Sequence, residues 1–451
     1  MRRAAIERDW TQGSIVGNLW SLSWPIMISQ MLNMLGPTID MIWVGRLGSD
    51  ALAAVGVSGM AVNVANSLIM GVFTSVRAMV ARFIGAGDRE SANHITQQAF
   101  VLGAVISAVI AVIGIFFSEQ ILAWLGVSEG VISTGAAYMR IQFIGIVTMS
   151  IRMITESAMQ ASGDSVNPMR IAVIFRIIHL GLCPALIFGF WLFPAMGVEG
   201  AAWTNVITQT LGGFMGLWFL VTGRTRMKLT FRNFRFDPAV IWRMVKIGLP
   251  AAITGIERSF ANILLVKFIS PFGTVAVAAQ SLEERIGQFI QMPAMGFGMA
   301  GGVMAGQNLG AGKPERAEKS GWIAAFCFTG IMVVGCLVIW FFSDYIVRIF
   351  NSEPELVAVT SNFLKIQIIS YLVFGFVLVL SQTLNGVGDT VVPMLVTLTT
   401  MWLVQVPMAY VLSKTTLGMY GVRWGIVLAI FLRAIIYIVY YRTGRWKHKK
   451  V

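Results

Sequence analysis

The sequence predicts an all-α integral membrane protein, with twelve transmembrane helices in two six-helix lobes related by a pseudo-two-fold axis along the membrane normal. Three observations predict this fold: few charges, long uncharged apolar windows and an internal repeat. Of the 451 residues, 56% are hydrophobic and only 12% are charged, which is about half the charged share of an average soluble chain. The windows 100–117, 201–221 and 321–342 carry no charge, over about the length that crosses a hydrocarbon core of ~30 Å.

Apolar runs between clusters of turn residues predict the individual helices. They lie near residues 15–46, 51–84, 94–117, 132–160, 167–192, 197–222, 244–271, 274–308, 318–342, 357–386, 391–413 and 420–441. Because their number is even, both termini are expected on the same side of the membrane.

The second half of the chain repeats the first at a constant spacing of 225 residues. The segment GAGDRESA (85–92) corresponds to GAGKPERA (310–317), and GDSVNPM (163–169) corresponds to GDTVVPM (388–394). A single spacing held over this length indicates duplication of a six-helix unit. Six is even, so both copies enter the membrane from the same side, and the space between them is the expected substrate pathway.

The charge distribution predicts the orientation. The chain has 34 basic and 21 acidic residues, and the basic ones gather in 224–246, in the tail after 441 and at Arg2, Arg3 and Arg8. The positive-inside rule therefore places both termini and the central loop in the cytoplasm. This explains the basic excess without a nucleic-acid partner. The expected organisation, in a multi-pass protein of the cell (inner or plasma) membrane, is a cytoplasmic N-terminus (1–14), a first lobe (15–222), a basic linker (223–243), a second lobe (244–441) and a basic tail (442–451).

Helix 1 carries a polar stripe within its apolar sequence. Gln30, Asn33 and Asp40 fall on one helical face. A charged side chain at membrane depth costs at least ~2.5 kcal/mol and is by default a functional candidate. Burial also favours the neutral form of a carboxyl group, so Asp40 could take up and release a proton. The structural alternative is a buried carboxylate that ties helix 1 to a neighbour such as Arg176.

Polar residues on helices 4 and 5 could join Asp40. Helix 4 carries Arg152, Glu156 and Gln160 at four-residue steps, and helix 5 carries Arg176 and His179. We expect Glu156, Arg176 and His179 to face the interior of the first lobe, where His179 could relay a proton. An ion-pair network that only fixes helix packing is the alternative.

The second lobe has its own candidates. Glu257 lies in helix 7, and helix 8 carries Gln280, Glu284 and Gln288 at four-residue steps, with Glu283 and Arg285 beside them. The helix 8 stripe could line the pathway and hold a cation. A local pair of Glu257 with Arg258 or Lys267, and a buried polar seam along helix 8, are the structural alternatives. The sequence has no metal cluster, nucleotide loop or nucleophile triad, so neither a metal, a cofactor nor an enzymatic reaction is expected.

These features together resemble the MATE (multidrug and toxic compound extrusion) family. The matching elements are DMIWVGRLG (40–48), ALAAVG (51–56) and the paired GAG and GD-x-x-x-PM turns. The resemblance implies two six-helix lobes forming a V, and antiport of organic substrates against H+ or Na+. It implies a coupling role for Asp40 and links Glu257 to cation coupling.

The chain departs from the sodium-coupled pattern of that family at two places. Such members often have Asn and Asp in helix 5, where this chain has His179 and Cys183, and a helix 10 carboxylate where it has Phe374. The prediction is therefore a secondary-active antiporter that exports organic, cationic or amphipathic compounds, xenobiotics included, in exchange for H+. Alternatives are a Na+-coupled multidrug antiporter, a flippase for lipid-linked precursors with a strongly basic cleft, and a passive channel.

Overall fold

The computed structural model describes residues 9–190 and 193–449, and the side chains of these residues except those of 258, 259, 262 and 263. The basic residues Arg2, Arg3 and Arg8 therefore lie outside the described part. So does the side chain of Arg258, the expected partner of Glu257.

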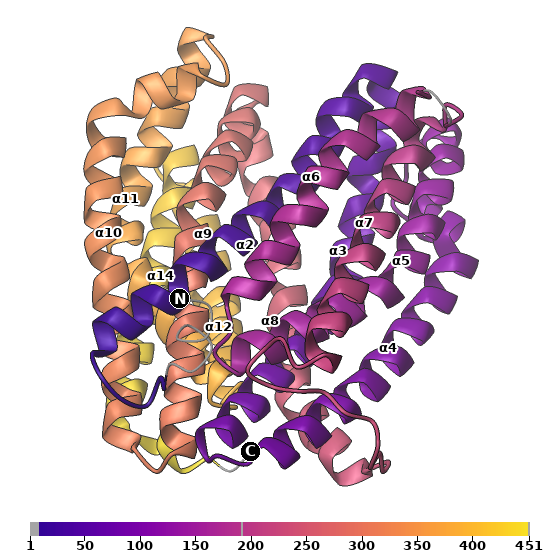
Figure 1. Ribbon diagram of the computed structural model, residues 1–451. Coiled ribbons are helices and arrows are strands. Elements are labelled where there is room, and N and C mark those ends of the chain that lie inside the picture. Colours follow the sequence, from indigo (N-terminus) through magenta and orange to yellow (C-terminus); the bar gives the residue numbers. More distant parts are fainter. Residues whose placement is uncertain (1–8, 191–192, 450–451) are drawn as a thin grey trace. The chain divides into compact units, whose positions relative to one another are not determined.

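All the regular structure in the described residues is helical (Figure 1). The first half forms α2 (Ile15–Val44), α3 (Ser49–Gly85), α4 (Arg89–Trp124), α5 (Glu129–Ala161), α6 (Val166–Phe188) and α7 (Gly197–Val221). The second half forms α8 (Pro238–Ile269), α9 (Thr274–Gly310), α10 (Pro314–Arg348), α11 (Pro354–Gly386), α12 (Val391–Thr400), α13 (Val406–Ser413) and α14 (Met419–Thr443). Each predicted span corresponds to one of these helices, with α12 and α13 forming the eleventh.

Two details differ from the expected helices. The eleventh span is interrupted by a π-helical turn, Met401–Gln405, because Pro407 lacks the N–H that would continue the regular ladder. The third and ninth helices are longer than their apolar runs. α4 begins at Arg89, where Asp88 accepts a hydrogen bond of 2.9 Å from the backbone N–H of Ser91. Such a cap lets a helix start in polar sequence.

Tight turns recur at equivalent positions of the two halves. The glycine pairs Gly48 and Gly273, Gly87 and Gly312, and Gly163 and Gly388 all have positive φ, with both members of the last pair at 90°. Glycine adopts this backbone conformation without the steric cost that a Cβ brings. The structure therefore repeats the turns that the sequence repeats.

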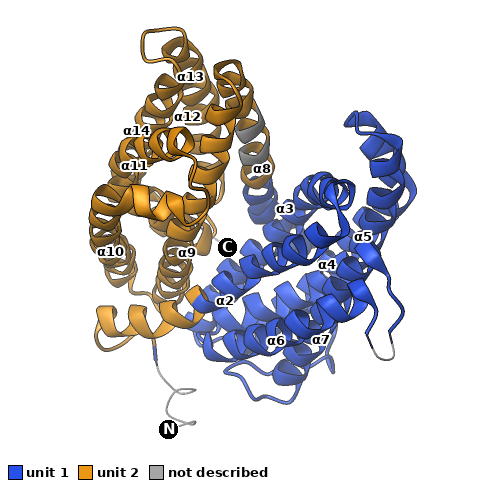
Figure 2. Ribbon diagram, turned by 90° about the horizontal axis from the view of Figure 1, so that it is seen from above, with its two compact units in different colours: residues 1–9, 28–252 blue, residues 10–27, 253–451 orange. Residues whose placement is uncertain are grey.

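The described chain divides into two compact units (Figure 2). One contains the residues from 28 to 252, and the other contains 10–27 and the residues from 253 onward. Helices α2 and α8 each contribute to both units, and they divide at Met27 and Ala252, which are equivalent positions of the repeat. In the first unit α5 packs on α3, α4 and α7. In the second unit the equivalent helix, α11, packs on α9, α10 and α14.

Small residues allow close helix packing in the second unit. A Cβ on Gly302 of α9 would lie 2.8 Å from the backbone oxygen of Gln382 and 3.1 Å from Cα of Gly386, both on α11. Small residues at such crossings are typical of membrane helix bundles, where packing has to replace the hydrophobic effect.

By length and composition alone, nine helices among the described residues qualify as membrane spans. The spans outside this group are α2, α7 and α9. Each of these three helices carries polar side chains of the buried clusters described below, among them Asp40 on α2, Asn205 on α7 and Glu283 on α9.

Candidate functional site

Asp40 is the centre of a buried polar cluster in the first unit. It lies one turn before the end of α2 and is only 2% exposed. Its Oδ1 lies 3.2 Å from Nε2 of His179 and accepts a hydrogen bond of 3.4 Å from Sγ of Cys183, both on α6. Its Oδ2 accepts a hydrogen bond of 2.6 Å from Nδ2 of Asn205 on α7. His179 and Cys183 are four residues apart, which puts them on one face of α6.

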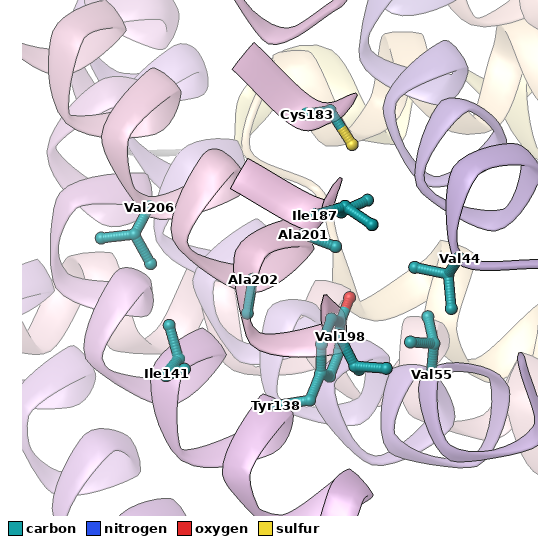
Figure 3. Close-up of a cluster of buried hydrophobic side chains, with 10 residues drawn as sticks. All are labelled: Val44, Val55, Tyr138, Ile141, Cys183, Ile187, Val198, Ala201, Ala202 and Val206. Atoms are coloured by element: carbon teal, nitrogen blue, oxygen red, sulfur yellow. The ribbon is translucent and has the colours of Figure 1, made fainter. Parts of the chain in front are cut away.

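An apolar cluster closes this site at the end where α2 ends. It contains Val44, Val55, Tyr138, Ile141, Cys183, Ile187, Val198, Ala201, Ala202 and Val206 (Figure 3). Cys183 belongs to both sets, and its sulfur points into the space above Ile187 in Figure 3. Because these side chains come from five helices and exclude water, they strengthen electrostatic interactions at Asp40.

Arg176 lies against α2, one turn before Asp40. Its Nη2 donates a hydrogen bond of 3.4 Å to the backbone oxygen of Asn33. A Cβ on Gly36 would collide with the guanidinium group, so glycine at this position is what admits the arginine. The guanidinium acts electrostatically on both Asp40 and Arg152.

A second buried cluster in the same unit is centred on Glu156 of α5. Arg152 donates a hydrogen bond of 2.8 Å to Glu156 and one of 2.5 Å to Oε1 of Gln209 on α7, and Gln160 donates one of 3.0 Å to Glu156. Phe175 lies between this cluster and Arg176. The guanidinium carbons of Arg152 and Arg176 are 5.3 Å and 5.2 Å from its ring centroid, within the range of cation–π contacts.

The structure thus brings His179 and Arg176 close to Asp40, as expected, and puts Glu156 in a neighbouring cluster. Gln30 and Asn33 lie further back on α2. Nδ2 of Asn33 donates a hydrogen bond of 3.3 Å to Oε1 of Gln30. The suggested alternative, in which Arg176 is the direct partner of Asp40, differs from the observed contacts, because Arg176 donates its hydrogen bond to the α2 backbone.

The second unit contains a different buried network. Arg423 of α14 donates a hydrogen bond of 2.5 Å to Glu283 of α9 and another to Gln280. Tyr371 of α11 donates one of 3.0 Å to Glu283, and Gln280 donates one of 2.5 Å to Glu284. Gln280 and Glu284 therefore meet as expected. Gln288, one turn further along α9, is exposed instead.

Glu257 lies on α8 in the second unit and is 6% exposed. Lys267, one of its suggested partners, is exposed near the end of the same helix. Among the residues that the structure describes, no group of three or more His, Cys, Asp and Glu side chains lies close enough to hold a metal ion.

Sequence reasoning missed Asn205, Gln209, Arg423 and Tyr371 as site residues. Asn205 and Gln209 stand four residues apart in the uncharged window 201–221, and two amides on one helical face were a usable signal. Arg423 falls in a helix whose equivalent position in the first half is Glu199, which is exposed. The repeat therefore gave no indication that Arg423 is buried.

A protein-family model matches both halves of the chain. The model MatE matches residues 25–185 and again residues 250–411. The chain belongs to the MATE family. The two matched ranges begin 225 residues apart, as the repeat requires. The chain is therefore a multi-pass membrane transporter, since MATE proteins are transporters and not enzymes.

Relatives of this MATE protein include efflux proteins. It is 29% identical over 436 residues to the probable multidrug resistance protein YoeA of Bacillus subtilis, covering 95% of this chain and 93% of YoeA. It is also 24% identical over 414 residues to an FAD transporter of Shewanella oneidensis, covering 91% of this chain and 90% of that one. The names of its relatives support multidrug efflux as the general function.

The fold is shared with solved structures. One is described as "Reverse polarity of binding pocket suggests different function of a MOP superfamily transporter from Pyrococcus furiosus Vc1". Its TM-score is 0.90 at 23% identity, and the match covers 98% of both chains. At this identity the likeness shows the fold, and the substrate has to be argued from this chain's own residues.

Proposed function

We propose that this MATE protein exports organic, cationic or amphipathic compounds by secondary-active antiport, and that H+ binding to Asp40 drives the exchange. The observation that carries the proposal is the contact set of Asp40. A carboxylate that is 2% exposed meets an imidazole nitrogen, a thiol and an amide N–H. These groups come from two other helices, so a change in the charge of Asp40 alters how α2, α6 and α7 are held together.

The same contact set favours H+ over Na+. Sodium is a hard cation and is bound by several oxygen ligands. Two of the three neighbours named above direct an N–H or S–H group at Asp40, and the third is a ring nitrogen. Such neighbours suit a carboxyl group that alternates between its ionised and protonated forms.

The exchange then follows from charge. While Asp40 is ionised, its negative charge offsets the positive field of the nearby Arg176, so a cationic substrate is not repelled from this part of the first unit. A proton that reaches Asp40, with His179 as a relay, removes the negative charge and leaves the positive field of Arg176. A cationic substrate is then repelled and released. Glu257 is the second candidate for a coupling carboxyl group, because it is buried in a helix of the other half.

The alternatives predict different charge and ion dependence. A Na+-coupled antiporter would respond to a sodium gradient at constant pH. A flippase for lipid-linked precursors would need an excess of positive charge to hold pyrophosphate groups. In the first unit, Arg152 is paired with Glu156, and Arg176 acts on Asp40. This balance favours an organic cation over a polyanion.

The experiment is efflux of a fluorescent organic cation from right-side-out vesicles, whose lumen corresponds to the cytoplasm, with a proton or a sodium gradient imposed separately. We expect the proton gradient alone to drive efflux and Asp40→Asn to abolish it. The matched control is Asp50→Asn, which removes an exposed carboxylate in the first turn of α3 and should leave efflux unchanged. Efflux driven by sodium alone, and retained in Asp40→Asn, would contradict the proposal.

A further inference from the structure

The segment that joins α7 to α8, residues 222–237, presents aromatic and basic side chains to the outside. Phe231, Phe234 and Phe236 are 51%, 44% and 62% exposed. Arg232 and Arg235, which alternate with them, are exposed as well. Three large apolar side chains next to arginines on one short connection are unusual for a surface that faces only water.

This exposure is built into the structure, because α4 holds the backbone of the segment. Asn93 donates a hydrogen bond of 3.1 Å to the backbone oxygen of Thr230 and accepts one of 2.9 Å from its N–H. Gln98 donates one of 2.6 Å to the oxygen of Arg235 and accepts one of 3.1 Å from the N–H of Asp237. The polar groups of the backbone are thus used on α4, while the Phe and Arg side chains remain exposed.

The start of α8 extends the same surface. Trp242 is 59% exposed, Arg243 and Lys246 are exposed, and Nζ of Lys246 lies 5.7 Å from the centroid of the Trp242 ring. The one acidic residue of 222–246, Asp237, is already engaged. It accepts hydrogen bonds from the backbone of Ala239 and Val240 and contacts His94. It therefore does not neutralise the arginines.

The surface lies where a membrane meets water, because it joins the ends of two membrane-spanning helices. Aromatic rings are enriched at this depth, and basic side chains there attract anionic headgroups. Arginine in particular binds phosphate with two parallel N–H donors. A free phosphate ion would use the arginines but leave the Phe and Trp rings in water, whereas a phospholipid satisfies both.

We propose that residues 231–246 form a binding site for anionic phospholipids, in which Arg232, Arg235 and Arg243 bind headgroup phosphates and the aromatic rings enter the interface. The site fixes the connection between the two halves of the chain to the membrane surface. The positive-inside rule explains only the basic residues of this surface, and not its aromatic ones. The additional role also accounts for the exposed aromatic rings and for the backbone held on α4, and it is independent of the transported substrate and the coupling ion.

Native mass spectrometry of the purified protein tests the site, by counting bound phosphatidylglycerol and phosphatidylcholine in titrations with each lipid. The wild type should prefer phosphatidylglycerol, and Arg232→Gln with Arg235→Gln should weaken its binding by about tenfold. The matched control, Arg348→Gln with Lys414→Gln, removes the same charge from two exposed positions of the second unit and should bind like the wild type. Equal binding by all three proteins would overturn the proposal. So would full displacement of the lipid by inorganic phosphate, which would indicate a free-anion site.

A depth measurement tests the aromatic part separately. A nitroxide attached at Phe236→Cys should be more accessible to oxygen than to a water-soluble nickel complex in vesicles that contain phosphatidylglycerol. The same label at Asn233→Cys, an exposed polar position of the segment, should show the opposite preference. Equal accessibility of both labels to the nickel complex would mean that the rings do not enter the membrane.

Discussion

Nδ2 of Asn205 on α7 donates a hydrogen bond of 2.6 Å to Oδ2 of Asp40 on α2. The same nitrogen also contacts the backbone oxygen of Ala201, at 3.2 Å, which fixes the orientation of the amide. Asp40 is therefore joined to α7 by Asn205, and to α6 by His179 and Cys183.

Asn205→Ala should slow proton-driven transport. The substitution removes the hydrogen bond that joins Asp40 to α7. A hydrogen bond to a charged group is worth about 1.5–3 kcal/mol, so we expect an efflux rate that is lower by roughly tenfold. The measurement is efflux at a constant proton gradient. Thr210→Ala, on the same helix, removes a hydroxyl group that bonds to its own backbone and should leave the rate unchanged. A wild-type rate for Asn205→Ala would show that this hydrogen bond does not contribute to coupling.

Arg423→Met should destabilise the protein strongly. The substitution leaves Glu283, 4% exposed, without its cationic partner, and an uncompensated buried charge typically costs about 3–5 kcal/mol. The double variant Glu283→Gln with Arg423→Met should recover much of that loss, because both charges are then absent. Thermal unfolding of the detergent-solubilised proteins measures this. A double variant no more stable than Arg423→Met alone would argue against the ion pair as the cause.

Gly302→Ala should weaken the packing of α9 on α11. The added Cβ would meet the backbone of Gln382 and Gly386, and backbone has to shift as a whole, so we expect a loss of about 1–3 kcal/mol. Gly330→Ala on α10 is the matched control, since a Cβ there meets nothing within 4 Å. Thermal unfolding of the two variants side by side checks the prediction. Equal stability would mean that α9 and α11 can separate at little cost.

The general architecture could be predicted from the sequence because it depends on local signals. Uncharged windows identify membrane helices without knowledge of their partners, and the repeat at 225 residues is visible directly. Helix ends were less predictable. α4 continues past its apolar run in both directions because Asp88 caps one end and because backbone hydrogen bonds do not require apolar side chains.

The sequence could identify candidate site residues within single helices, but it could not identify their partners on other helices. Asp40, Arg176 and His179 stand out as polar residues in apolar helices. Their partners come from far along the chain: Asn205 is 165 residues from Asp40, and Arg423 is 140 residues from Glu283. Which polar side chains meet across such separations depends on helix rotation and packing, and the repeat is no guide where only one copy carries the charge.

The attachment of residues 222–237 to α4 should weaken at low pH. The backbone N–H of Val240 and the contact with His94 lower the pKa of Asp237 below the usual Asp value of 3.8. Because the folded-state pKa is depressed, this attachment is fully stabilised above the usual Asp range and is lost as the pH falls through the depressed pKa. Pepsin cleavage of the segment should therefore accelerate only in strong acid.

Two substitutions separate charge from capping at Asp237. Asp237→Asn keeps an N-cap oxygen for the first turn of α8. Its cleavage by pepsin should therefore not accelerate in strong acid as that of the wild type does. Asp237→Ala loses the cap as well and should be cleaved faster already at neutral pH, with trypsin as the protease. If cleavage of Asp237→Asn accelerated in acid as that of the wild type does, another group would be responsible for the acid sensitivity.

The most direct test of the central claim counts protons against substrate. Purified protein in liposomes, with a pH dye inside and an organic cation added outside, should release protons from the liposomes as the cation enters, at constant sodium and zero membrane potential. Asp40→Asn should fold and reconstitute into liposomes as well as the wild type, yet move no protons. A wild-type proton signal in Asp40→Asn, or substrate entry that requires sodium and moves no protons, would contradict the assignment of Asp40 as the proton-coupling group.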